Sequence, residues 1–139
     1  MTREEWKARS RAFERSAATL LANAHYDMAY HLAGIAVECA LKARIAALFR
    51  SNDLPDKNLV DDIYRNGHNL AALAKLAGLG IDLAAQEAVS IAFRENWATV
   101  RAWSINSRYV ASTQQEATNM MNAVARRGTG VLPWIRHRW

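Results

Sequence analysis

The sequence predicts an all-α protein, an antiparallel bundle of four main helices with one or two short helices. Three observations support this fold class. The 139 residues include only 6 glycines and 2 prolines, apolar residues recur at helical spacing, and capping boxes stand at Thr2 to Glu5 and at Thr113 to Glu116. The length is typical of one domain, so we expect a single domain over residues 1–139.

The first helix is expected to begin at the Thr2 to Glu5 capping box. Its apolar residues recur at helical spacing while charged residues occupy the other face, which predicts an amphipathic and half-exposed helix. The apolar positions are Trp6, Phe13, Ala17, Leu20 and Ala24.

The second helix is expected from about Asp27 to Arg50 and is apolar nearly all round. A helix of that kind needs partners on most of its faces, so we expect it at the centre of the bundle. Its apolar residues include Met28, Leu32, Ile35, Ala36, Val37, Cys39, Ala40, Leu41 and Ile45.

Two short helices are expected in the middle of the chain, after a loop over Ser51 to Pro55. The first passes through Leu59 and Ile63 and ends at Asn66 and Gly67, a common helix-ending pair. His68 is expected to open the second. That helix directs three leucines to the core and is closed by two glycines: Leu70, Leu73, Leu76, Gly78 and Gly80.

A long helix is expected to follow, with Asp82 as its N-cap and Trp103 near its end. Residues 104–112 form a polar, turn-like break. The last helix begins at the Thr113 to Glu116 capping box, and Gly128, Gly130 or Pro133 is expected to end or kink it. The apolar positions of these two helices are Ala85, Ala88, Ile91, Ala92, Met120, Met121 and Val124.

Composition excludes several classes of function. The single Cys39 cannot form an intrachain disulfide or a cysteine-based zinc site, which fits a reducing compartment. The first 15 residues are rich in charge and do not resemble a signal peptide, so we expect a cytoplasmic protein. Charged residues interrupt the most apolar stretch, Met28 to Leu48, and a membrane partner is therefore not expected.

The net charge of +5 is spread unevenly, because no acidic residue follows Glu116. The arginines of this basic end have two readings. They could contact phosphates of a nucleic acid, or they could form a solvated helix end that suits the helix dipole. They are Arg126, Arg127, Arg136 and Arg138.

A narrow polar line runs along the second helix. Asp27, His31, Gly34, Glu38 and Lys42 follow one another at steps of four, three, four and four residues, which places them on one face. One interpretation is a polar groove or symmetric interface, with Gly34 letting another backbone approach. The other is a solvent-facing stripe with a Glu38 to Lys42 ion pair. Both stay open.

No pattern predicts a metal or another cofactor. Helical bundles can hold metal pairs through Glu-x-x-His motifs, and the sequence contains none. His68 follows Gly67 and is either an ordinary helix-start residue or a catalyst. Arg101, Arg108 and Tyr109 flank the polar break and are candidates for a polar site. A glycine-rich phosphate loop, a nucleophile elbow and a Ser, His and Asp arrangement are not evident from spacing.

Three segments together resemble the HEPN domain family (higher eukaryotes and prokaryotes nucleotide-binding), over about residues 10 to 125. They are AYHLAGIAVECALKARIAAL from Ala29, GHNLAAL from Gly67, and W-x4-RY from Trp103 to Tyr109. The resemblance implies a helical bundle, a homodimer and a minimal nucleotidyltransferase as partner in a toxin and antitoxin pair. The positions that match family motifs are Glu38, Lys42, His68, Arg108 and Tyr109.

Many HEPN proteins are metal-independent ribonucleases with an arginine four to six residues before a histidine, and this chain has no such pair. Arg65 and His68 enclose only two residues. We therefore expect a module that binds a nucleotide, RNA or a nucleotidyltransferase. The alternatives are a ribonuclease that assembles His68 with Arg101 or Arg108 in space, and a purely structural homodimerisation domain.

Overall fold

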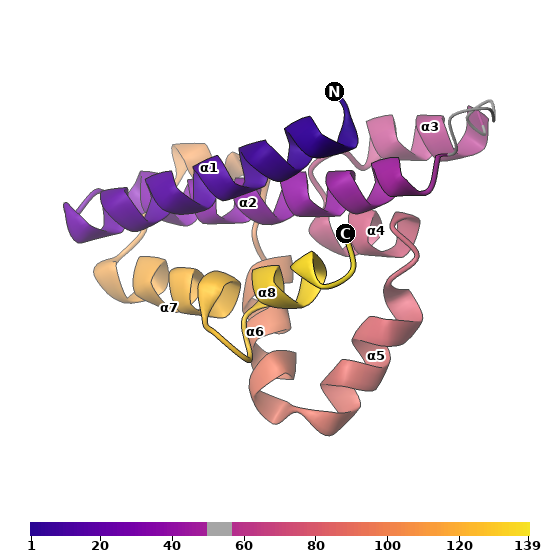
Figure 1. Cartoon of the computed structure of the whole chain (residues 1–139). Coiled ribbons are helices and arrows are strands. Elements are labelled where there is room, and N and C mark those ends of the chain that lie inside the picture. The colour runs from indigo at the N-terminus through magenta and orange to yellow at the C-terminus, as the bar shows by residue number, and fades with distance from the viewer. Residues whose placement is uncertain (50–56) are drawn as a thin grey trace.

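The structure, a computed structural model, describes residues 1–49 and 57–139 and is all-α over those residues (Figure 1). It contains eight α-helices and one 3-10 segment within these ranges. They are α1 (Arg3–Ala22), α2 (Tyr26–Ala47), α3 (Lys57–Arg65), α4 (Leu70–Leu76), α5 (Gly80–Val89), α6 (Ile91–Arg101), the 3-10 segment η1 (Ile105–Tyr109), α7 (Gln114–Ala125) and α8 (Val131–Arg136). The all-α prediction is confirmed for the described residues.

Helices α1 and α2 form an antiparallel pair that is the main packing contact of the molecule. The first capping box is confirmed, because the Thr2 side chain accepts from the Glu5 backbone and the Glu5 side chain accepts from the Thr2 backbone. The buried Ser10 hydroxyl donates to the Ala36 carbonyl at 2.8 Å and links the two helices. These contacts fix α1 along one side of α2.

The central position expected for the second helix is confirmed. Helix α2 also contacts α4, α7, α8 and η1, and most of its residues are buried. It begins at Tyr26, one residue before the expected start, and ends at Ala47. The expected end at Arg50 and the expected loop over Ser51 to Pro55 lie outside the described residues.

The long helix expected from Asp82 to Trp103 is instead two helices, α5 and α6, that meet at an angle at Ser90 (Figure 1). Ser90 is extended, and its hydroxyl accepts from the Phe93 backbone at 3.1 Å. A serine in this role starts a new helix. Asp82 lies in the first turn of α5, whereas the N-cap is Leu79.

The other helix boundaries follow local chemistry. Asn69, rather than His68, caps α4 by accepting from the Ala72 backbone at 3.0 Å. The capping box at Thr113 is present at the start of α7. Helix α7 ends at Ala125, and the chain forms a separate helix, α8, after Gly128, whose φ is +88°. Over residues 1–49 and 57–139, none of the helices is both long and apolar enough to cross a membrane.

Candidate functional site

The middle of the polar line of α2 is buried inside the molecule, whereas Asp27 at its start is exposed. The exposed fraction is 7% for His31 and 5% for Glu38. The interpretation of this line as a solvent-facing stripe is therefore wrong, although its ion pair is present, with 2.7 Å between Lys42 Nζ and Glu38 Oε1. The line faces segments that come from later parts of the chain.

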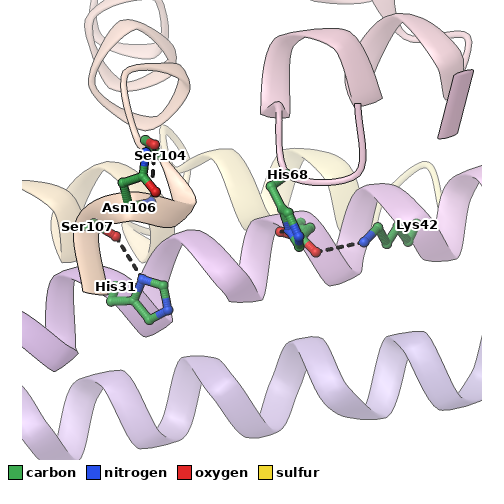
Figure 2. Close-up of polar contacts among 7 residues, drawn as sticks. His31, Lys42, His68, Ser104, Asn106 and Ser107 are labelled. Atoms are coloured by element: carbon green, nitrogen blue, oxygen red, sulfur yellow. Dashed lines mark hydrogen bonds and ion pairs between the residues drawn. The ribbon is translucent and has the colours of Figure 1, made fainter. Parts of the chain in front are cut away.

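The N-terminal part of the line holds the segment around η1. The Ser112 backbone N–H donates to Asp27 Oδ1 at 2.6 Å, and His31 Nδ1 lies 2.7 Å from Ser107 Oγ (Figure 2). Ser104 caps η1 by accepting from the Asn106 backbone. Two hydrogen bonds, at Asp27 and at His31, thus join the polar break after α6 to α2.

Gly34, in the middle of the line, allows close packing of an indole ring and not of a backbone. A Cβ atom built on Gly34 would overlap Cδ1, Nε1 and Cε2 of Trp103. Trp103 is only 4% exposed, and its ring lies 5.7 Å from the His31 ring between centroids. Glycine is needed here because any side chain would push the indole out of the core.

The C-terminal part of the line places Glu38 between two cationic or titratable groups. Glu38 Oε1 pairs with Lys42 Nζ, and Glu38 Oε2 lies 2.9 Å from His68 Nδ1 (Figure 2). His68 comes from the turn before α4, which Asn69 stabilises through its backbone bond to the Asn66 carbonyl. The buried carboxylate thereby fixes Lys42 and His68 beside each other.

Lys42 and His68 border a pocket of about 540 Å³, called here the Lys42 pocket. Its walls are otherwise mostly apolar and include three aromatic side chains. Lys42 Nζ lies 5.2 Å from the centre of the Trp6 ring, and the His68 side chain is 54% exposed. The pocket is lined by Met1, Trp6, Lys42, Ile45, Ala46, Phe49, Val60, Ile63, Tyr64, Gly67 and His68.

The remaining candidates lie elsewhere. Arg101 is exposed at the end of α6, and Arg108 Cζ lies 4.7 Å from the ring of Tyr109, which is 76% exposed. Segment η1 contacts α2 at His31, whereas His68 contacts α2 at Glu38. His31 and Glu38 are seven positions apart, which is roughly 10 Å along the helix. The six predicted residues thus divide into three parts. They are a Glu38, Lys42 and His68 group, an exposed arginine and tyrosine group made of Arg108 and Tyr109, and Arg101 at the end of α6.

The histidine that interacts electrostatically with Arg108 is His31. The sequence placed His31 on the polar line of the second helix and did not connect it with Arg108. Burial, and then the positive charge of Arg108, lower the pKa of His31, while the Glu38 carboxylate opposes this shift. Its partner Ser107 is 76 positions away in the sequence. No local spacing signal could have joined these two residues.

The described residues contain neither a cluster of possible metal ligands nor a thiol with a lowered pKa. Among residues 1–49 and 57–139, no three or more His, Cys, Asp or Glu side chains are grouped as metal ligands. Burial raises the pKa of Cys39 to about 11, so this thiol is protonated and poorly nucleophilic at neutral pH.

Comparisons with family models, curated proteins and solved structures gave no match for the chain.

Proposed function

We propose that the chain is a HEPN-like binding module that holds a nucleotide in the Lys42 pocket. The observation that carries this proposal is the buried Glu38, which fixes Lys42 and His68 at the edge of an aromatic-lined pocket. A nucleotide combines a flat base with an anionic phosphate. Such a ligand suits apolar and aromatic walls with a few convergent polar groups.

The roles proposed for residues that line the Lys42 pocket follow from their places in the pocket wall. Trp6, Phe49 and Tyr64 provide apolar or aromatic contact for the base. Lys42 supplies an ammonium group that is already oriented by Glu38 and therefore loses less conformational freedom on binding. His68 is exposed enough to contact the ligand, and its Nε2 can donate to a phosphate oxygen when both ring nitrogens carry a proton.

Lys42→Met is expected to weaken AMP and ATP binding by about tenfold or more, because a charge-assisted hydrogen bond contributes about 1.5–3 kcal/mol. Methionine keeps the apolar stem and removes the charge. Isothermal titration at two salt concentrations measures the change, and the wild-type affinity should fall as salt rises. Lys75→Met is the matched control, because Lys75 is exposed on α4.

Single-stranded RNA is titrated in the same experiment together with Arg108→Ala. Binding that is lost in Arg108→Ala and kept in Lys42→Met would place the ligand at the exposed arginine and tyrosine group instead. Absence of binding for AMP, ATP and RNA at low salt would contradict the proposal as a whole.

The proposal includes the homodimer and the nucleotidyltransferase partner implied by the sequence resemblance, together with the cytoplasmic location. It also takes α1, α2, α6 and α7 as the four main helices of the bundle.

Light scattering during size-exclusion chromatography is expected to give twice the chain mass of 15.6 kDa, the mass of the proposed homodimer. A strict monomer across the accessible concentration range would remove the homodimer from the proposal.

A further inference from the structure

A second pocket lies beside η1, and one of its lining residues is a serine that is hydrogen-bonded to a buried histidine. Its volume is about 210 Å³, and Ser107 is one of its lining residues. Ser107 Oγ and His31 Nδ1 are 2.7 Å apart, within the range for a hydroxyl hydrogen bond. Both residues are largely buried, with exposed fractions of 9% and 7%. Ser107 therefore has a fixed hydrogen-bond partner in His31 and itself lines a small cavity.

The surroundings of His31 favour its neutral form by lowering its pKa. Burial and the Arg108 charge on η1 lower the pKa of His31, and Glu38 on the same helix opposes them. Two other carboxylates lie on neighbouring parts of the site, Asp27 bonded to the Ser112 backbone and Glu116 on the pocket wall. When Nε2 carries the ring proton, Nδ1 accepts from the Ser107 hydroxyl, which is the arrangement a general base requires.

The pocket also offers polar groups near the hydroxyl. Ser104 and Asn106 line the same cavity and lie next to Ser107 in Figure 2. A side-chain amide can donate to a developing oxyanion. The cavity is smaller than the roughly 300–1,000 Å³ typical of drug-sized ligands, so it suits a group of a few carbon atoms.

We propose that Ser107 is a nucleophile activated by His31 and that it accepts acyl groups from short-chain carboxylic esters. Ser107 Oγ forms a bond to the carbonyl carbon while its proton passes to His31 Nδ1. The bond from that carbon to the leaving oxygen breaks. The leaving group departs either as an alcohol that takes the proton from His31, or as a phenolate, in which case His31 gives that proton to solvent. Water then attacks the acyl-serine with His31 as base, releasing the carboxylate and restoring the serine. This activity is independent of the Lys42 pocket.

The test uses the full chain and p-nitrophenyl acetate. The wild type is expected to release p-nitrophenolate and to gain the mass of one acetyl group, which peptide mass spectrometry places on Ser107. Ser107→Ala should lose this adduct. His31→Gln should slow acetylation by about 100-fold or more, because general-base assistance contributes about 10²–10⁴-fold. Ser16→Ala and His25→Gln are matched controls at exposed positions and should react like the wild type.

If His31→Gln fails to fold, the dependence of the wild-type acetylation rate on pH still tests the role of His31. The acetylation rate of Ser107 should rise with pH through a midpoint below the usual histidine value of about 6.5, because neutral His31 is the active form. A rate that rises only in the alkaline range would overturn the proposal. Acetylation confined to lysines, or equal labelling of Ser107→Ala and the wild type, would overturn it as well.

Discussion

Gly34→Ala is expected to lower the free energy of unfolding by about 2 kcal/mol, a net value in which overpacking a well-packed core costs about 3 kcal/mol. The added methyl group would overlap the indole of Trp103, a ring that is 4% exposed. The better helix propensity of alanine offsets only about 1 kcal/mol of that cost. Urea unfolding monitored by far-ultraviolet circular dichroism measures the change.

Gly80→Ala is the matched control for this prediction. Gly80 is the first residue of α5, and a Cβ atom there would meet only Lys75 Cγ at 4.0 Å. Its unfolding free energy should therefore stay within about 1 kcal/mol of the wild type. The double variant Gly34→Ala with Trp103→Leu should be less destabilised than the sum of the single changes. A Gly34→Ala protein as stable as the wild type would contradict the indole packing.

Glu38→Ala is expected to lower the free energy of unfolding by about 3 kcal/mol, because removing one member of a buried ion pair leaves the other without its partner. Glu38 is 5% exposed and pairs with both Lys42 and His68. Lys42 is left part-buried beside the Trp6 ring. Urea unfolding at low and high salt measures the loss, which should change little with salt because buried pairs are weakly screened.

Glu95→Ala provides the comparison for an exposed carboxylate. Glu95 lies on the exposed side of α6, and surface substitutions of this kind usually change stability by less than about 0.5 kcal/mol. A Glu38→Ala protein no less stable than Glu95→Ala would contradict the tethering role of Glu38. It would also weaken the nucleotide proposal, since Lys42 and His68 are oriented by the same carboxylate.

The sequence predicted the helix starts that are marked by a capping box. Both capping boxes are present, and the apolar character of α2 correctly placed it at the centre. The Glu38 to Lys42 pair follows from an i, i+4 spacing. The prediction was wrong at Ser90, because the apolar spacing continues across it while its hydroxyl caps a new helix. Periodicity carries no signal for such a change of helix direction.

The candidate site depends far more on tertiary structure. The sequence predicted Glu38, Lys42 and His68 as site residues but not the contacts among the distant ones. The contact from His68 to Glu38 spans 30 positions, and that from Ser107 to His31 spans 76. Helical spacing constrains residues three or four apart, whereas contacts at these separations depend on how helices pack and how loops fold back. By itself the sequence therefore determined a central helix with a polar line. Only the packing decided that the middle of this line is buried, and which side chains contact it.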